Sequence, residues 1–207
     1  MYRPPHYRID DDAAAFRLIA DHAFATLATV ANGAPKLSQL PIIADNDRRV
    51  LRGHLARANP HSALLAGARG LALFAGADGY ISPNWYVDRA RVPTWDYQAV
   101  EVEGVIQIID APGDVDQLLT DLSHHFECRR HDLDRDVEWT IDKLPEKKRS
   151  ALRNGIAAFE LQIERIEMKA KLNQKDNAAD RDGAIAALSS GDESQRKLAD
   201  AMREAAR

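Results

Sequence analysis

The stretch FATLATVANGAPKLSQLPII, residues 24–43, decides the fold class of this chain. Its first eight residues are apolar or β-branched, and Asn32 and Gly33, which both tolerate positive φ, follow them directly. Such a pair between two β-prone runs is a strong hairpin signal, and the return strand is expected over 35–43. A third β-prone run, VLRGHLA at 50–56, comes after a polar turn. Together these segments predict an antiparallel β-meander.

Four more segments have the pattern of strands. Residues 70–76 and 79–83 are short β-prone runs, while 97–109 and 156–166 alternate between apolar and polar side chains. Helices are expected after an Asp10 N-cap, over 114–129, over 179–188 and over 193–206. Because hairpins come early and few helices lie between the strands, the pattern favours an antiparallel barrel over a doubly wound parallel sheet. The expected fold class is mainly β with peripheral helices (α+β).

Composition and charge exclude several classes of protein. Hydrophobic types make up 45% of the residues, enough for a core, and no apolar run reaches the ~18 residues of a membrane span. The single cysteine, Cys128, cannot form an internal disulfide, which fits a reducing compartment. The start lacks the features of a signal peptide, and the net charge of -4 argues against broad phosphate-driven nucleic-acid binding. We therefore expect a cytoplasmic protein without a membrane segment.

The first candidate site is GHLARANP, residues 53–60, at the end of a predicted strand. Asn59 is expected to cap a short helix that begins at the next residue. The free N–H groups of such a helix start and the guanidinium of Arg57 could together bind a phosphate, with the backbone from His54 to Ala56 beside them. The alternative is an ordinary strand-to-helix corner with a solvated arginine.

The second candidate site is aromatic. YISPNWY at 80–86 and VPTWDY at 92–97 place three tyrosines and two tryptophans close together in a chain that is 6% aromatic. Aromatic faces suit a planar heterocycle, and hydroxyl groups can bind its polar substituents. The residues expected to contact such a ligand are Tyr80, Ser82, Trp85, Tyr86, Thr94 and Trp95. The alternative is a satellite aromatic cluster or a dimer interface, where tyrosine and tryptophan are also common.

Two other segments carry cationic or metal-binding side chains. KAKLNQKDN at 169–177 could present Lys171 and Gln174 to a phosphate, or could be a solvated loop. His124 and Cys128 are four residues apart in a predicted helix, so a zinc site there is conceivable. No second ligand pair with finger spacing appears elsewhere in the sequence, and we expect no metal.

Taken in chain order, these segments resemble the PaiB family of FMN-binding negative transcriptional regulators. The matching pieces are MYRPPHY at 1–7, FATLAT at 24–29, GHLARANP at 53–60, YISPNWY at 80–86, VPTWDYQAVEVEG at 92–104, KAKLNQ at 169–174 and Asp180-Arg181. The resemblance covers nearly the whole chain. It implies a split β-barrel related to pyridoxamine-phosphate-oxidase-like flavoproteins, with FMN bound at the subunit interface of a homodimer.

If the chain binds FMN, we expect several of the candidate residues to have distinct roles. The phosphate would be bound by Arg57, Lys171 and the backbone after His54. The phosphate or the ribityl hydroxyls would be bound by Ser82 and Thr94. The isoalloxazine ring would be lined by Trp85, Tyr86 and Trp95. No residue is a self-evident catalytic acid or base. Two departures from the family pattern stand out. Ser38-Gln39-Leu40-Pro41 replaces a common Thr-His-Leu-Pro, so position 39 has no imidazole, and Asn173 replaces a common serine.

The expected domains are an FMN-binding split barrel over 1–176 and a helical extension over 177–207 that packs on the barrel or on its partner. The expected function is negative transcriptional regulation with flavin as a structural or sensing ligand. DNA contact would come from the C-terminal helices or from a partner protein, although residues 165–207 hold nine basic against eight acidic side chains, a weak charge for DNA. The open alternatives are an FMN-dependent oxidoreductase, a haem-binding protein that uses His54, His22 or the His124 cluster, and an interaction module without a ligand.

Overall fold

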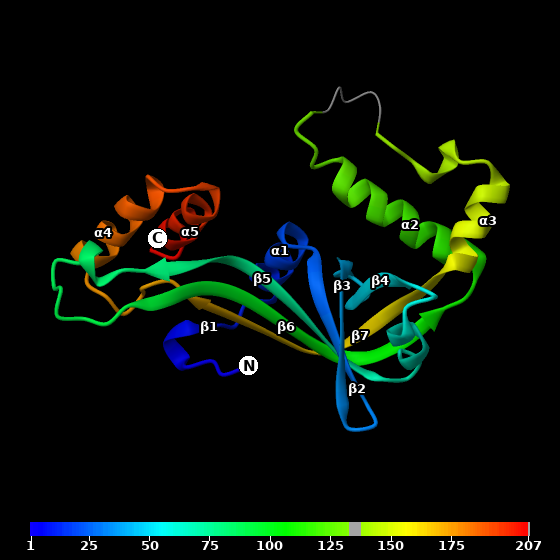
Figure 1. The fold of residues 1–207 in the computed structure, drawn as a ribbon, viewed down its shortest axis with the longest axis horizontal. Helices are drawn as coiled ribbons and strands as arrows, with labels where there is room; N and C mark the ends of the chain where they lie inside the picture. Colours follow the sequence, from blue (N-terminus) through cyan, green and yellow to red (C-terminus); the bar gives the residue numbers. More distant parts are fainter. Residues whose placement is uncertain (133–137, 207) are drawn as a thin grey trace. The chain divides into compact units, whose positions relative to one another are not determined.

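The computed structural model describes residues 1–132 and 138–206, and Figure 1 shows their elements as a ribbon. The strands are β1 (Arg8–Ile9), β2 (Phe24–Ala31), β3 (Ala34–Asp45), β4 (Val50–Ala56), β5 (Arg69–Ile81), β6 (Thr94–Ile109) and β7 (Ile156–Lys171). The helices are α1 (Asp12–Asp21), α2 (Pro112–Glu127), α3 (Glu146–Gly155), α4 (Ala178–Ser189) and α5 (Glu193–Glu204). Short 3-10 turns are η1 (Pro5–Tyr7), η2 (Pro60–Leu64), η3 (Pro83–Trp85) and η4 (Ile141–Lys143). Among these described helices, none is long and apolar enough to cross a bilayer.

The chain divides into two compact units. The first unit holds residues 1–22, 74–101 and 166–207, and the second holds 23–73 and 102–165. The long strands β5, β6 and β7 each contribute residues to both units. The domain boundary expected after residue 176 stays a prediction, and the residues on both sides of it belong to the first unit.

The β2–β3 hairpin predicted from the sequence is confirmed. Its last pair joins Ala31 to Ala34. The two residues between them have the positive φ that a tight turn of this kind requires, 52° at Asn32 and 75° at Gly33. Both β2 and β4 have their predicted bounds. Alternation along β2 buries Leu27 completely, so the hairpin supplies one wall of the core.

The strands of the second unit form a closed sheet. Their order is β7-β4-β3-β2-β5-β6, and β6 also pairs with β7, which closes the sheet into the predicted split barrel. Fully buried side chains fill its interior: Leu27, Ile42, Leu51, Ile106, Phe159 and Leu161. Close approach of β6 to β7 explains the glycine at position 104, because a Cβ there would overlap the carbonyl oxygen of Gln162.

Helices α2 and α3 also belong to the second unit (Figure 1). The apolar stripe of α2 packs on the sheet in a cluster of Ile43, Val115, Leu118, Leu122 and Ala158. Two salt bridges also hold the helices in place. Arg52 Nη2 of β4 lies 2.8 Å from Asp121 Oδ2 of α2, and Arg153 Nη1 of α3 lies 2.7 Å from Asp116 Oδ2 of α2. These contacts hold the end of α3, and hence the start of β7, beside α2.

The first unit combines β1, α1, the C-terminal helices and parts of the long strands. α1 is capped by Asp11, whose carboxylate accepts from the N–H of Ala13 at 2.8 Å, one residue later than the cap predicted at Asp10. α4 and α5 form a hairpin (Figure 1). They share a core with β5 and β7 that contains Ile81, Leu172, Ala184, Leu188, Leu198 and Met202.

Two further features of the fold differ from the sequence prediction. The runs 70–76 and 79–83 belong to the single strand β5. Gly76 does not break this strand; a Cβ there would lie 3.0 Å from Leu18 Cδ1, so the glycine permits close packing. Helix α3 was not predicted, because it buries none of its residues and therefore has no apolar periodicity to detect.

Candidate functional site

The residues predicted to bind a phosphate lie in the second unit, where β4 ends. Arg57 Nε donates to the carbonyl oxygen of Asn154 at 3.0 Å, and its Nη2 donates to that of Ile156 at 2.6 Å. Both acceptors are neutral, and no described carboxylate forms an ion pair with Arg57. Ala56, the last residue of β4, is exposed beside it. The guanidinium is thus anchored by the backbone and keeps its charge available to an anion.

His54 lies on β4 and is largely buried. Burial lowers its pKa, so the ring is neutral at pH 7. Its Nδ1 is buried and has no hydrogen-bond partner among the described residues. Strand alternation places His54 on the same face as Arg52, which pairs with Asp121 of α2. His54 therefore faces the α2 side of the sheet, and within the described residues its buried Nδ1 accepts and donates no hydrogen bond, which is uncommon for a buried polar atom.

Asn59 caps η2 as predicted and also begins a partly buried hydrogen-bond network. Its Oδ1 accepts from the backbone N–H of His61 at 3.0 Å, and its Nδ2 donates to Ser38 Oγ at 3.2 Å. Ser38 Oγ lies 2.9 Å from His61 Nδ1, and Thr29 Oγ1 lies 2.9 Å from His61 Nε2. The sequence analysis missed Thr29 and His61, because no sequence signal pairs β2 with η2; the one hint is that His61 directly follows GHLARANP.

Lys171 lies in the first unit and is held by protein groups. Its Nζ donates to the hydroxyl of Thr94, and to the carbonyl of Trp95 at 2.6 Å. It also lies 3.3 Å from Oδ1 of Asp96, which is completely buried. Burial raises the pKa of Asp96 to about 6, while the charge of Lys171 acts in the opposite direction. Because this ion pair balances the lysine, a contact between Lys171 and a phosphate stays a prediction.

The predicted aromatic residues separate into two groups within the first unit. Trp85 is half-buried against the core of α4 and α5, and Tyr86 is 5% exposed and hydrogen-bonds to the side chain of Asn173 at 3.1 Å. Tyr80 and Trp95, by contrast, are 48% and 53% exposed, with ring centres 6.4 Å apart in an edge-to-face contact. Of these four predicted residues, all within the described part of the chain, Tyr80 and Trp95 are the ones that present open aromatic surface to a ligand.

Ser82 and Gln174 make short-range contacts that shape the backbone. Ser82 Oγ accepts from the N–H of Asn84 at 3.2 Å and so caps η3. Gln174 Oε1 accepts from the N–H of Leu172 at 2.7 Å, and its Nε2 donates to the carbonyl of Ala170 at 2.5 Å. Both side chains order loops beside the predicted ligand contacts, and their direct contact with FMN stays a prediction.

A carboxylate that the sequence analysis gave no role, Asp180, holds the aromatic loop to α4. Its Oδ1 accepts from the N–H of Val87 at 2.7 Å, and its Oδ2 lies 3.0 Å from Nη1 of Arg91. Burial opposes its ionisation, but the N–H groups of Val87 and Asp88 and the side chains of Arg91 and Asn177 outweigh burial and lower its pKa. The Asp180-Arg181 match to the family thus marks a structural anchor.

The described residues suit two different parts of an FMN molecule, its phosphate and its flat ring. A phosphate needs cations and hydrogen-bond donors, and the second unit offers these at Arg57, Asn59 and Ser38. A flat ring needs aromatic surface, and the first unit offers it at Tyr80 and Trp95. The residues suited to the phosphate belong to the second unit, and the aromatic pair belongs to the first.

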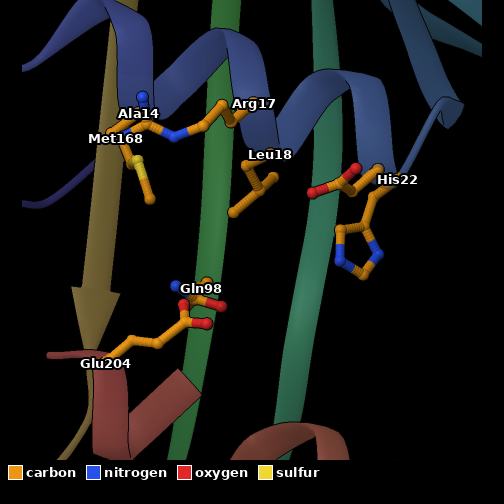
Figure 2. Close-up of a pocket in the computed structure, with 8 residues that line it drawn as sticks. Ala14, Arg17, Leu18, His22, Gln98, Met168 and Glu204 are labelled. Atoms are coloured by element: carbon orange, nitrogen blue, oxygen red, sulfur yellow. The ribbon is translucent and has the colours of Figure 1, made fainter. Parts of the chain in front are cut away.

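Figure 2 shows a polar pocket in the first unit, with a volume of about 420 Å³. Its lining residues are Ala14, Arg17, Leu18, Asp21, His22, Gln98, Met168 and Glu204. The side chains of Gln98 and Glu204 lie together across the pocket from α1, which carries Arg17 (Figure 2). None of the residues predicted to bind FMN is among the residues that line this pocket.

Together, the closed antiparallel barrel and these polar and aromatic groups define the class as a flavin-binding split-barrel protein. Residues 1–165 match the family described as "Putative FMN-binding domain", and the chain belongs to this family. It is 30% identical over 183 residues to the Protease synthase and sporulation protein PAI 2 of Bacillus subtilis (strain 168). That match covers 87% of this chain and 85% of the relative. The predicted PaiB family and its FMN cofactor are thereby confirmed.

Solved structures support the fold. The FAD and Heme binding protein from Mycobacterium smegmatis superposes with a TM-score of 0.61 at 19% identity, covering 87% of this chain and 80% of that protein. The Flavocytochrome Anf3 from Azotobacter vinelandii gives a TM-score of 0.60 at 12% identity, covering 83% and 72%. At these identities the likeness concerns the architecture alone, which is that of a split barrel.

Proposed function

We propose that two copies of this chain form a homodimer that binds FMN and acts as a negative regulator of transcription. The flavin serves as a structural or sensing ligand. One observation carries the flavin part: Arg57 is a backbone-anchored cation with no described carboxylate partner. It comes two residues before Asn59, whose Nδ2 donates to Ser38 Oγ. In a member of an FMN-binding family, this arrangement suits the phosphate of the cofactor.

The homodimer part is supported by one exposed face of the barrel. Phe24, Val30 and Leu37 are 63%, 69% and 65% exposed. The β2–β3 register and strand alternation place all three on the same face, opposite the buried Leu27. Beside them lies an apolar hollow of about 240 Å³ lined in part by Ala28, Pro35 and Leu71. Exposed apolar side chains that share one face in this way are typical of an interface, and a second copy would cover them symmetrically.

The regulatory part is supported by the membership in the PaiB family and by the relationship to PAI 2, whose full name is "Protease synthase and sporulation protein PAI 2". The cations of α5 are engaged within the chain: Lys197 pairs with Glu193 at 2.7 Å, and Arg203 with Asp200 at 2.6 Å. We therefore propose that DNA contact comes from a partner protein or from a surface formed by the dimer. FMN, when bound, would supply a ring that accepts and releases electrons and so could report the redox state.

Three measurements on the purified full chain test the flavin and homodimer parts of this proposal. We expect a flavin absorption spectrum, saturable FMN binding by fluorescence quenching, and the mass of a dimer by light scattering. A mobility-shift assay with promoter DNA at low salt, where electrostatic binding is strongest, then tests regulation with and without FMN. A colourless monomer that leaves added FMN fluorescence unchanged would contradict the flavin proposal. A dimer that binds FMN but shifts no promoter DNA, alone or with extract proteins, would contradict only the regulatory part.

A further inference from the structure

Three side chains of the second unit form a hydrogen-bonded series that leads from the buried interior to the surface. Thr29 is 2% exposed and its Oγ1 lies 2.9 Å from Nε2 of His61, which is 4% exposed. His61 Nδ1 lies 2.9 Å from Oγ of Ser38, which is half-exposed. The series therefore has a buried end at Thr29 and an accessible end at Ser38.

The side chain of Asn59 restricts how protons can be arranged at Ser38. Because Asn59 Oδ1 accepts from the backbone N–H of His61, its Nδ2 must donate to Ser38 Oγ. A hydroxyl has two acceptor positions and one donor proton. If His61 carries its proton on Nδ1, it fills the second acceptor position, and the Ser38 O–H must then donate to a group outside the network. In the other tautomer, Ser38 donates inward to His61 and offers no proton outward.

The surroundings of His61 favour an anion at the accessible end. Burial lowers the pKa of His61, and the ammonium of Lys36 lowers it further, so the ring is neutral at pH 7 with one donor and one acceptor. The charge that acts on His61 from the described residues is thus positive. An anion beside Ser38 would be attracted by Lys36 and would select the tautomer with the proton on Nδ1.

We propose that Thr29, His61 and Ser38 form a relay that binds a phosphate oxyanion through the Ser38 hydroxyl. Thr29 O–H donates to His61 Nε2, His61 Nδ1–H donates to Ser38 Oγ, and Ser38 O–H donates to an oxygen of the phosphate. All three donors point outward, so each bond polarises the next. No proton is transferred, and His61 is a positioning residue. The inference rests on the proposed function when the phosphate is that of FMN; free inorganic phosphate is the other source of the same chemistry.

The first experiment compares the affinities of the full chain for FMN and riboflavin, which differ by the phosphate. In Ser38→Ala we expect FMN to bind roughly tenfold or more weakly, the scale of a hydrogen bond to a charged group, while riboflavin affinity stays unchanged. Inorganic phosphate should compete with FMN in the wild type but not with riboflavin. Ser123→Ala, which removes a hydroxyl from α2 in the same unit, is the control and should change neither affinity. Equal effects of Ser38→Ala on both flavins, or no effect on either, would overturn the proposal.

The second experiment observes the relay directly and does not need flavin. In the ¹⁵N spectrum of the histidine rings, added inorganic phosphate should move His61 to the tautomer protonated on Nδ1. Thr29→Val, which removes the donor to Nε2, should weaken this response, and Thr29→Ser should restore it. If no flavin binds but phosphate produces this shift, the proposed function fails and the relay stands. If flavin binds while phosphate and FMN leave the tautomer of His61 unchanged, the relay is refuted and the proposed function stands.

Discussion

Asp96 is the buried residue whose ionisation should govern the pH dependence of stability. Burial raises the pKa of its carboxyl from 3.8 to about 6, with Lys171 opposing the rise. A carboxyl that binds its proton more tightly in the folded state stabilises the fold at low pH. That contribution is complete below the unfolded pKa and is lost as pH rises through the folded one. The shift lowers the free energy of unfolding by roughly 2–3 kcal/mol between about pH 4 and pH 7.

The test compares the wild type with Asp96→Asn in urea unfolding from pH 4 to pH 8. We expect the free energy of unfolding of the wild type to fall, relative to Asp96→Asn, by roughly this amount over that range. All other titrating groups are common to both proteins and cancel. Asp200→Asn, which removes an exposed carboxylate in the same unit, serves as the control for the loss of one negative charge. Parallel curves for Asp96→Asn would show that Asp96 has an ordinary pKa.

Arg57 offers a second test at the residue scale, because its charge and its anchoring can be separated. Arg57→Ala should weaken FMN binding by roughly 1–3 kcal/mol, the range for a charge-assisted hydrogen bond. Arg57→Lys keeps the charge but cannot span the carbonyls of Asn154 and Ile156, so it should recover part of the affinity. Arg48→Ala, which removes another exposed arginine of the same unit, is the control for general charge effects. Flavin titrations that give the same affinity for all four proteins would remove Arg57 from the site.

Sequence reasoning reached some of these residues and not others for identifiable reasons. Asn59 was correctly predicted as a cap, because an asparagine before a proline signals a helix start locally. The pairing of Lys171 with Asp96 could not be predicted, since it depends on how β6 and β7 meet. Tyr86 and Trp95 gave the same signal in the sequence, yet one is buried and the other exposed. Aromatic type alone does not tell a core residue from a ligand contact.

At the scale of elements, prediction succeeded where the pattern is local. The β2–β3 hairpin follows from two turn residues between alternating strands, and α4 and α5 lie where helices were expected, over 179–188 and 193–206. It failed for α3, which has no buried face. It also failed at the glycines of β5, which serve close packing and do not end the strand. Glycine in a sequence cannot by itself distinguish a turn from a close approach.

The same ambiguity yields a prediction for α4, where Gly183 faces η3. A Cβ at Gly183 would overlap the carbonyl oxygen of Trp85, so Gly183→Ala must shift the helix away from η3. Alanine favours helix by about 1 kcal/mol over glycine, but backbone displacement in a packed core costs typically 1–3 kcal/mol. We expect the second effect to dominate and the melting temperature to fall. Gly113→Ala in α2, where a Cβ meets nothing within 4 Å, should be neutral or stabilising. If both variants had a higher melting temperature than the wild type, the prediction that a Cβ at position 183 has no room beside the Trp85 carbonyl oxygen would be wrong.

At the scale of the whole molecule, the barrel class followed from sequence because successive strands and tight turns dictate antiparallel neighbours. The surface that such a barrel leaves uncovered could not be predicted in the same way. Val30 and Leu37 occupy apolar positions of strands, and the sequence does not tell whether their face is covered by a helix or by another chain. Within the described residues that face is open, which is why the proposed homodimer places its interface there.

The last prediction tests that interface by introducing one positive charge into each copy of the chain. In a two-fold dimer each substitution acts twice. Leu37→Lys should therefore remove the free energy gained by burying the leucine side chain, about 1.5–3 kcal/mol, once in each copy. It should also add repulsion between like charges across the interface. We expect light scattering at micromolar concentration to show a monomer, with weaker FMN binding if the site draws on both copies. Val92→Lys, which changes a side chain that is 79% exposed in the first unit, should stay dimeric. A Leu37→Lys protein that remains a dimer would move the interface elsewhere, whereas a monomer with unchanged FMN affinity would confine the flavin site to a single copy.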